Sequence, residues 1–575
     1  MKRIVCLLLL CILLIGSMIV VQARDPEYDQ EYRPQFHYTP KANWMNDPNG
    51  LVYNEETKEY HMYYQYCQTL EEDQNKKYWG HAVSKDLVHW QELPVAIGPD
   101  ELGSIWSGSA VIDKKNTSGL FDDKTPEGAR MVALFTYAGG DSKYGFEKVG
   151  LAYSKDNGLT WTKHEGNPVI ASVENNTIVF DGAFRDPKVI WYEDDSYENG
   201  GIWLMVIAGG EARIFTSENL IDWTYNSTMK KADGKEIQSE CPDFYPLEVE
   251  GSGGKIKWVY SAAGRSYYVG DLTKDSNGYF RFTADNNEQV LMRLPTDMYA
   301  AQTFFNDPKG RRIAVYWMLD LSSKEQNNLN EKLWDGCQSL PLEMKLVQTD
   351  DGHELRVYPV EELDSLISDK LLFESSGDVV NGQYDKLQNV TGENLYIEIE
   401  LQPGSAKYFD IYVREGGEEK TLIRYNKNAG TVTIIRRDSG AFVKDNVSVQ
   451  TDLNSDGNIK LKIYVDTSVV DVFTDTGAYI QGLIFPAKTS TGLHMETKNG
   501  DMTVKSIKIY EMNSAWDEVS INDDTATHEP DDTNDDANDG FPVLYIILII
   551  AGAIVIVAII VIVMCIVVKK KRGIL

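Results

Sequence analysis

Basic residues are scarce in this chain of 575 residues, with 56 Lys and Arg against 87 Asp and Glu, and the formal net charge is −31. A strongly acidic surface repels phosphate, which argues against nucleic acid as a partner. Apolar residues are not scarce: 42% of the chain is hydrophobic and 11% aromatic, which excludes disorder over most of its length. The 32 Tyr and 12 Trp, with few runs of helical apolar period, favour β structure.

Cysteine is also rare, with six residues in the chain. The two apolar ends hold three of them, and the others are Cys67, Cys241 and Cys337. Three cysteines are too few for a disulfide scaffold, and whether Cys67 and Cys337 pair stays open because sequence does not show proximity. The eight His show no paired ligand spacing, so we expect no metal and no cofactor.

The first 23 residues have the three parts of a secretory signal peptide. Lys2 and Arg3 make a basic start, an apolar run follows from Ile4 to Val21, and Ala23 is a small residue at the expected cleavage point. We expect cleavage near Ala23. The run is also long enough for an uncleaved anchor, which remains the alternative.

A second apolar run, residues 541–568, is unbroken and exceeds the roughly 20 residues that a membrane-spanning helix needs. Residues 569–575 follow as a short basic tail, which the positive-inside tendency keeps in the cytoplasm. A lipid-anchor signal ends in its apolar tail instead. We therefore expect a single-pass protein of the cell surface, with its amino-terminal bulk outside.

Residues 513–540, just before this run, carry ten Asp and Glu and no Lys or Arg. Such a segment repels itself, so we expect an extended, disordered stalk. A calcium site is the alternative, but the fixed ligand spacing of an EF-hand loop is absent. Five Asn-x-Ser/Thr sequons fit a glycosylated ectodomain, and they begin at Asn116, Asn175, Asn226, Asn389 and Asn446.

Three stretches share one pattern, in which a polar turn beginning with Ser follows a strand-like run and ends at Trp. They are Ser84–Trp90, Ser154–Trp161 and Ser217–Trp223, and their starts lie 70 and then 63 residues apart. Ser-Lys-Asp and Ser-Glu-Asn form turns between β-prone residues, so each stretch predicts a hairpin. The period suits four-stranded units with long loops, and residues 33–358 then hold about five blades of a β-propeller. A β-sandwich with coincidental turns is the alternative.

From residue 371 to 512 the pattern changes to short alternating strands punctuated by Gly, Asn and Asp, which is typical of an antiparallel β-sandwich. Strands are expected at 395–401, 408–414, 421–425, 431–436, 460–466 and 469–473. The acidic segment 359–370 is expected to be a loop-like linker between the two domains. The predicted fold class is therefore all-β, with one carboxy-terminal transmembrane helix.

Three motifs in the propeller region each carry an acid: Trp-Met-Asn-Asp-Pro-Asn-Gly at 44–50, Phe-Arg-Asp-Pro at 184–187 and Ser-Glu-Cys-Pro-Asp-Phe at 239–244. In the first, Pro-Asn-Gly is expected to turn the chain sharply. In the second, successive side chains of a strand point to opposite faces, so we expect no direct pair between Arg185 and Asp186. Each motif alone has an ordinary explanation as a turn, a surface pair or a buried Cys. Together, in this order, they indicate a catalytic site.

With Tyr64-Gln65-Tyr66, Trp79-Gly80, Trp106–Ser109 and Trp334-x-Gly336, these motifs give the chain a specific resemblance to glycoside hydrolase family 32. This family comprises the β-fructofuranosidases, which include invertases, levanases and inulinases. The resemblance extends from about residue 35 to 512. It implies a five-bladed β-propeller with an appended β-sandwich. It also implies retaining hydrolysis of terminal β-D-fructofuranosides in sucrose or fructans, through a covalent fructosyl-enzyme intermediate.

By the same resemblance, Asp47 is expected to be the nucleophile, Glu240 the acid/base and Asp186 the stabiliser that binds fructose hydroxyls. This chemistry requires one carboxylate at the anomeric carbon and one acid at the glycosidic oxygen, and crowded acids in one pocket shift one another's pKa. The expected substrate-binding residues are four hydrogen-bonding side chains, four aromatic walls and a free thiol: Asn46, Gln65, Ser107, Arg185, Trp44, Trp79, Trp106, Trp334 and Cys241.

Some positions depart from the family's usual pattern. Ser239 stands where Trp often precedes Glu-Cys, which opens the leaving-group side, and Asp471 replaces the Glu of the sandwich motif Val-Glu-Val-Phe. The first departure leaves the preferred fructoside open. A fructosyltransferase, in which a sugar hydroxyl replaces water, and a surface lectin with a dead site are the alternatives. The presence of all three acids argues against the lectin.

Overall fold

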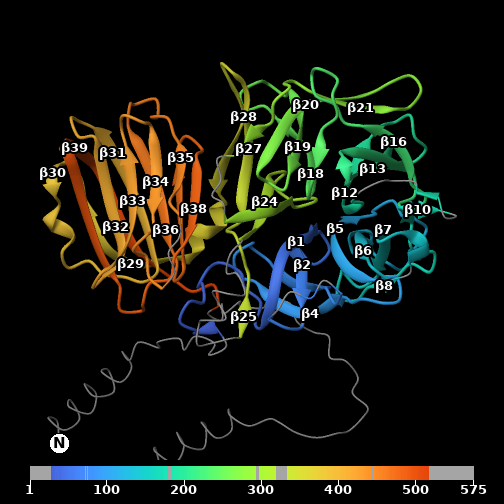
Figure 1. The fold of residues 1–575 in the computed structure, drawn as a ribbon, viewed down its shortest axis with the longest axis horizontal. Coiled ribbons are helices and arrows are strands. Elements are labelled where there is room, and N and C mark those ends of the chain that lie inside the picture. Colours follow the sequence, from blue (N-terminus) through green and yellow to red (C-terminus); the bar gives the residue numbers. More distant parts are fainter. Residues whose placement is uncertain are drawn as a thin grey trace, which may run out of the picture. The chain divides into compact units, whose positions relative to one another are not determined.

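The structure is a computed structural model that describes residues 28–70, 73, 75–140, 142–174, 177–178, 183–292, 297–318, 333–441 and 445–516. All of them belong to one compact unit of the chain, Met1–Asp517. This unit contains a β-propeller, coloured blue to yellow in Figure 1, and a β-sandwich, coloured mainly orange. The predicted all-β architecture is confirmed for the described residues.

The part of the chain that the structure describes holds no helix with the length and hydropathy of a membrane span. The predicted signal peptide 1–23, membrane helix 541–568 and tail 569–575 lie outside the described residues, as does the predicted stalk from residue 517 onward.

Five antiparallel sheets form the propeller blades. In chain order their strands are β1 (Asn43–Asn54), β2 (Glu59–Cys67), β3 (Tyr78–Ser84) and β4 (Gln91–Ile97); β5 (Ser104–Ile112), β6 (Met131–Ala138), β7 (Glu147–Ser154) and β8 (Thr162–Lys163); β12 (Arg185–Glu193), β13 (Gly201–Ala208), β15 (Arg213–Ser217) and β16 (Thr224–Thr228); β18 (Pro242–Glu248), β19 (Ile256–Ala262), β20 (Ser266–Lys274) and β21 (Phe280–Ala284); β23 (Met298–Thr303), β24 (Arg312–Met318), β27 (Leu342–Thr349) and β28 (Gly352–Pro359).

Short strands and 3-10 turns complete this part. They are β9 (Ile170–Ala171), β10 (Val173–Glu174), β11 (Thr177–Ile178), β14 (Gly210–Glu211), β17 (Gln238–Ser239), β22 (Val290–Leu291), β25 (Trp334–Asp335), β26 (Cys337–Gln338), η2 (Glu127–Ala129) and η3 (Ser142–Tyr144).

The first strand of each blade is the innermost. β1, β5, β12, β18 and β23 contact one another in this order, and β23 contacts β1, which closes the ring. Closure also uses β25, which pairs in parallel with β1, Asn43 opposite Trp334. A closed ring removes most exposed sheet edges and brings the inner strands of all blades around one axis.

The repeated turns that predict the blades share one hydrogen-bonding scheme. Each joins the third and fourth strands of a blade, as the antiparallel pairs β3–β4, β7–β8 and β15–β16 show. The Ser hydroxyl accepts a bond from a backbone N–H of the turn, and the Trp indole N–H donates to a turn carbonyl: Trp90 to Leu87, Trp161 to Gly158 and Trp223 to Leu220, at 2.8, 3.1 and 2.7 Å. The hairpin prediction is confirmed, and the Trp recurs because it caps the turn.

Two local predictions are wrong. Pro-Asn-Gly at 48–50 does not turn the chain but lies within the bulged strand β1, where Gly50 has φ 51° and a Cβ would lie 2.8 Å from the Tyr63 ring. The glycine therefore serves close packing. The acidic segment 359–370 is not a loop: η4 (Glu361–Leu366) buries Leu363 and Leu366, and β29 begins at Ile367.

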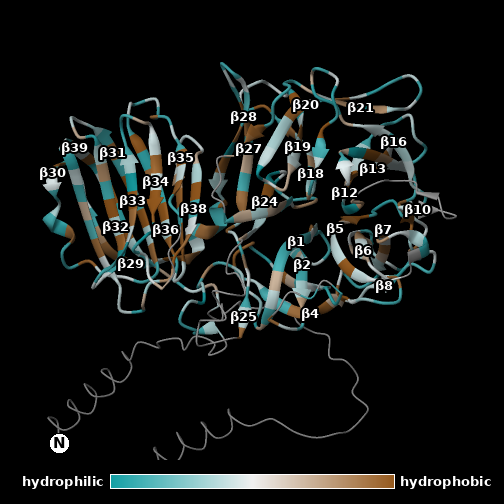
Figure 2. Cartoon of the chain, in the orientation of Figure 1, coloured by the Kyte–Doolittle hydropathy of each residue, from teal (hydrophilic) through white to brown (hydrophobic). Residues whose placement is uncertain are grey.

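The sandwich strands are β29 (Ile367–Ser375), β30 (Asp378–Gln383), β31 (Leu395–Pro403), β32 (Tyr408–Gly416), β33 (Glu419–Asn426), β34 (Thr431–Ile435), β35 (Val447–Gln450), β36 (Ile459–Val465), β37 (Val469–Thr474), β38 (Tyr479–Leu483) and β39 (Gly492–Met512), with the turn η5 (Asp385–Leu387). The six predicted strands are all present. The long strand β39 pairs with β32 through its first half and with β31 through its second. Figure 2 shows hydrophobic residues along these strands and hydrophilic ones in the loops.

Polar contacts join the sandwich to the segment that precedes the first blade. His37 is fully buried between Asp466 and Asp471, and Asp466 also accepts the backbone N–H groups of Gln35 and Phe36. Asp471, which replaces the usual Glu, therefore holds the amino-terminal segment. A second join pairs Arg436 with Asp297, both buried.

The first residues of the predicted stalk are folded. Trp516 stacks on Tyr28 with ring centroids 4.0 Å apart, and its indole N–H donates to Pro34 O. The Ala515 N–H donates to Gln35 O. The prediction that the stalk begins at residue 513 is therefore wrong, because Ala515 and Trp516 pack on the amino-terminal segment.

Candidate active site

The site residues lie in irregularities of the inner strands. Register shifts interrupt the strand pairing between Met45 and Pro48 in β1, Trp106 and Gly108 in β5, Arg185 and Lys188 in β12, and Tyr299 and Gln302 in β23. Bulges of this kind re-aim side chains next to active sites. Here they leave Asn46, Asp47, Ser107 and Asp186 off the regular ladder, in three different blades.

Asp47 is held by hydrogen bonds at both carboxylate oxygens. Ser107 Oγ donates to Oδ2 at 2.8 Å, and Asn46 Nδ2 donates to Oδ1 at 3.0 Å. The Asn46 backbone is fixed in turn by Gln338 Nε2, which donates to its carbonyl at 2.7 Å. The carboxylate therefore has one fixed orientation, as a nucleophile requires.

Arg185 and Asp186 do form a direct pair, against the expectation from strand alternation. Arg185 Nε lies 3.5 Å from Asp186 Oδ2. The reason is the left-handed backbone of Asp186, with φ 57°, which breaks the alternation within the bulge. Thr136 Oγ1 supports this conformation: it accepts the Asp186 N–H at 2.9 Å and donates to Ser107 O at 3.0 Å.

Glu240 lies between β17 and β18 and is bound by the same arginine. Arg185 Nη2 donates to Glu240 Oε2 at 2.7 Å, while Nη1 donates to Glu147 Oε1 at 3.1 Å. The Glu240 side chain is 41% exposed, the most open of the three acids. Its neighbour Cys241 also has a left-handed backbone, with φ 38°, and its thiol lies 3.8 Å from Glu240 Oε1.

Burial and crowding dominate the electrostatics of the pocket. Burial raises the pKa of Asp186 to about 8; Arg185 opposes the rise, and the charges of the neighbouring carboxylates add to it. Burial also raises the pKa of Asp47, against the positive charge of Lys77 and the two hydrogen bonds described above. Asp47 and Asp186 therefore titrate as a coupled pair.

The predicted aromatic walls differ in environment. Trp44 and Trp106 flank Lys77, whose ammonium lies 4.9 and 5.9 Å from their ring centroids. Trp79 is fully buried, and its indole N–H donates to Trp106 O at 3.0 Å. In this structure it therefore supports Trp106, another of the predicted aromatic walls. Trp334 is 5% exposed and packs under Arg33 at the join to the sandwich; its role at the substrate stays a prediction.

The other predicted contacts are supporting groups in this structure. Gln65 is 1% exposed, and its Nε2 donates to Ile105 O at 3.0 Å, which fixes β5 next to Trp106 and Ser107.

Cys67, Cys241 and Cys337 are free thiols, so Cys67 and Cys337 do not pair.

Sequence reasoning missed four residues of the site. Lys77 and Glu147 lie outside the recognised motifs, and the hydroxyl of Thr136 carries no sequence signal of its own. Tyr299, on the inner strand β23, faces Cys241, Glu240 and Asp47; burial raises its pKa, and the two carboxylates add to the rise. The sequence signal that could have identified Tyr299 is its position at the start of a fifth inner strand.

Comparison with known proteins decides the family. Residues 37–359 match the model of the Glycosyl hydrolases family 32 N-terminal domain, and residues 362–511 match that of the Glycosyl hydrolases family 32 C terminal. The chain belongs to glycoside hydrolase family 32. Both departures from its pattern have defined partners in the structure: Ser239 Oγ accepts the Tyr260 hydroxyl at 2.7 Å, and Asp471 binds His37.

Relatives of this family 32 chain include fructan-degrading enzymes. Levanase from Bacillus subtilis (strain 168) is 35% identical over 90% of this chain and 76% of its own length. Fructan beta-fructosidase from Streptococcus mutans is 32% identical over 85% of this chain but only 34% of its own length, and levanase from Bacillus sp. (strain L7) is matched over 53% of its length. The crystal structure of exo-inulinase from Aspergillus awamori superposes with a TM-score of 0.73 at 29% identity, covering 85% of this chain and 100% of that one.

Among the described residues, Asp186, Glu240 and Cys241 form the one group of ligand-type atoms lying within 4.8 Å of one another. The Arg185 guanidinium already supplies the positive charge between the two carboxylates. Burial raises the pKa of the Cys241 thiol well above its usual range, which disfavours the thiolate that a metal needs. In this family 32 chain the group therefore fits a hydrolytic site better than a metal centre.

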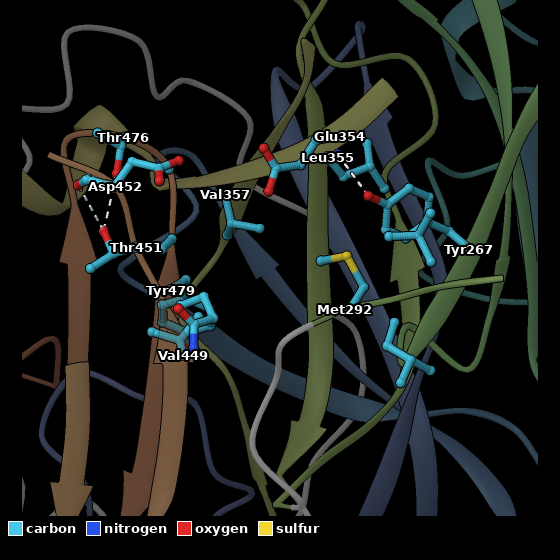
Figure 3. Close-up of a pocket in the computed structure, with 15 residues that line it drawn as sticks. Tyr267, Met292, Glu354, Leu355, Val357, Val449, Thr451, Asp452, Thr476 and Tyr479 are labelled. Carbon is cyan, nitrogen blue, oxygen red and sulfur yellow. Dashed lines mark hydrogen bonds between the residues drawn. The ribbon is translucent and has the colours of Figure 1, made fainter. Parts of the chain in front are cut away.

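A separate groove lies between the propeller and the sandwich (Figure 3). Its volume is about 90 Å³, and its walls include Tyr267, Met292 and Glu354 on one side and Val449 and Asp452 on the other. None of the three predicted catalytic acids lines it. The three acids lie at the inner strands of the propeller instead, outside this groove.

Proposed function

We propose that this chain is a retaining exo-acting β-fructofuranosidase that releases fructose from sucrose, fructans or both. Three acids converge in the pocket: Asp47 from the first blade, Asp186 from the third and Glu240 at the entry to the fourth. The relatives named levanase, fructan beta-fructosidase and exo-inulinase, and a fructofuranosidase from Schwanniomyces occidentalis solved in complex with fructose (TM-score 0.70, 26% identity), point to fructosides as the substrate class.

In the first step, an oxygen of the Asp47 carboxylate attacks the anomeric carbon C2 of the terminal fructose. The bond from C2 to the glycosidic oxygen breaks, and Glu240 transfers its proton to that oxygen, so the leaving sugar departs as an alcohol. Ser107 and Asn46 orient Asp47 throughout. Asp186 binds fructose hydroxyls. The positive charge that develops on C2 and the ring oxygen in the transition state is stabilised by the surrounding carboxylates.

In the second step, Glu240 takes a proton from water, and the resulting hydroxide oxygen bonds to C2. The ester bond to Asp47 breaks and regenerates the carboxylate, and fructose leaves with its anomeric configuration retained. Retaining geometry requires the Asp47 and Glu240 carboxyl groups to lie about 5–5.5 Å apart around bound substrate.

The observation that carries this proposal is the pair of fixed acids: Asp47 held by two hydrogen bonds and Glu240 held by Arg185. Its test is fructose release from sucrose, inulin and levan by the full chain in detergent. We expect release by the natural chain and by the exposed control Asp233→Asn, and none by Asp47→Asn. Release from none of the three substrates by the natural chain would overturn the proposal.

We further propose that the enzyme is a cell-surface, single-pass protein with a cleaved signal peptide and a helix at 541–568. The apolar runs, the basic tail and the acidic stalk support this. Alkaline extraction and protease protection of intact cells test it.

Glycans are proposed at Asn389 and Asn446, whose side chains are exposed, whereas the Asn116 and Asn226 amides are bound to Phe121 O and Gly278 O.

A further inference from the structure

Lys77 enters the active site from a backbone position fixed by the neighbouring blade. It lies just before β3, and its N–H donates to Ser104 Oγ at 2.8 Å. Its carbonyl accepts the Ile105 N–H at 3.0 Å. These bonds hold Lys77 against the start of β5, the strand that carries Trp106 and Ser107.

The Lys77 side chain packs against aromatic rings rather than extending into solvent. The residue is 6% exposed, whereas its neighbour Lys76 is exposed. The ammonium lies between two indole rings, 4.9 Å from the Trp44 centroid and 5.9 Å from the Trp106 centroid. The negative faces of both rings stabilise a cation there.

The two rings place the ammonium beside Asp47: Trp44 lies three residues before Asp47 in β1, and Trp106 adjoins Ser107, whose hydroxyl binds the Asp47 carboxylate at 2.8 Å. Burial raises the pKa of Asp47, and the positive charge of Lys77 lowers it against that rise.

The ionisable groups that face Asp47 come from several elements around the pocket; they are Lys77, Asp186, Glu240, Cys241 and Tyr299. The second cation of the site, Arg185, is paired with Asp186, Glu240 and Glu147, so Lys77 is the cation that acts on Asp47. Between two aromatic faces its charge is poorly screened by water, so it reaches Asp47 with more than its surface strength.

The geometry points to Lys77 as a positioning residue that keeps Asp47 ionised, an inference that rests on the proposed function, in which Asp47 is the nucleophile. It explains how a carboxylate buried among other acids is kept ready to attack C2. Without Lys77, the neighbouring negative charges and burial favour the protonated acid, which is no nucleophile.

The test compares the pH dependence of kcat/KM for fructose release by the natural chain, Lys77→Met, Lys77→Arg and the control Lys76→Met. Methionine fills a similar volume without charge. The acid limb of the profile reports the carboxyl set of the free enzyme. In Lys77→Met this limb moves to higher pH by about one unit, with the plateau at higher pH little changed, while Lys77→Arg and Lys76→Met keep the natural limb.

If the acid limb of Lys77→Met coincides with that of Lys76→Met, the inference is overturned. An equal loss of kcat/KM at every pH also overturns it, because such a loss indicates a purely structural role for Lys77. If Lys77→Met lacks the circular dichroism and melting transition of the natural chain, Lys77→Gln is scored by the same criteria. A natural chain that releases no fructose instead rejects the proposed function itself, so the two failures are distinct.

Discussion

The Arg185 guanidinium joins two acids of the candidate site: Nη2 donates to Glu240 Oε2 at 2.7 Å, and Nε lies 3.5 Å from Asp186 Oδ2. Its third nitrogen donates to Glu147. One planar group therefore sets the spacing of three carboxylates that repel one another. A lysine at this position keeps the charge but offers a single ammonium, which cannot reach all three.

Arg185→Lys is expected to lower kcat/KM for sucrose by roughly 10- to 100-fold, because it removes one or two charge-assisted hydrogen bonds. Steady-state kinetics measure the loss. The matched control is Arg281→Lys, a half-exposed arginine of β21 that pairs with the surface residue Asp275 and lies over the Tyr279 ring, away from the candidate site. Equal activity of the two variants would show that the guanidinium geometry is dispensable.

Asp47→Ala is expected to abolish turnover of every fructoside, because no other group forms the covalent bond. Glu240→Ala is expected to lose most activity on sucrose but to spare an aryl β-fructofuranoside with an acidic phenol, since protonation matters less for a good leaving group. Release of sugar and of phenol is measured in parallel. Equal losses of Glu240→Ala on both substrates would contradict its acid/base role.

The three acids could be found from sequence because each sits in a recognisable motif, but their arrangement could not. Alternation in a regular strand separates Arg185 from Asp186, whereas the positive φ of Asp186 brings them together. Such bulges depend on bonds from distant residues, here Thr136. Lys77 was missed for the same reason: only the folded ring brings it between Trp44 and Trp106.

The fold was predictable where the pattern was local and repeated, as in the hairpins ending at Trp90 and Trp161. Prediction from sequence failed where packing between distant residues determines the local structure. Gly50 suggested a turn but is required by the Tyr63 ring, and Trp516, within an acidic run, is held by Tyr28. A single tryptophan among acidic residues gives no periodic pattern of apolar residues, so the sequence alone placed Trp516 in the stalk.

His37 is expected to make stability depend on pH. Burial alone lowers the pKa of a histidine, but Asp471 and Asp466, at 3.1 and 2.8 Å, raise that of His37 to about 9. The folded pKa exceeds the unfolded value near 6.5, so the protonated ring stabilises the fold fully below about pH 6.5. This contribution, on the order of 3 kcal/mol, is lost as the pH rises toward 9.

Urea unfolding of the natural chain and of His37→Gln measures this contribution. The difference in free energy of unfolding between them should be largest near about pH 6 and shrink toward about pH 9. His494→Gln is the control, because that ring is partly exposed and lies 3.7 Å from its carboxylate. A difference between His37→Gln and the natural chain that stays constant with pH would mean that His37 is neutral in the fold.

The ectodomain is expected to fold and act without the predicted membrane helix, provided that the chain keeps Trp516. The active-site motifs all lie between Trp44 and Trp334, far from the predicted membrane helix in the sequence. Ending the chain at Met512 removes the Ala515 bond to Gln35 and the stack of Trp516 on Tyr28. Fully burying a large apolar side chain is worth about 1.5–3 kcal/mol, and Trp516 is partly buried, so its loss costs up to that amount.

We therefore expect a chain of residues 24–517 to release fructose at the rate of the full protein in detergent. A chain of residues 24–512 should retain that rate at low temperature but melt several degrees lower, because the lost contacts pin the amino-terminal segment and not the pocket. Trp516→Ala in the longer chain should reproduce most of the drop. A longer chain that is folded but inactive would contradict this prediction and show that the stalk or the helix shapes the site.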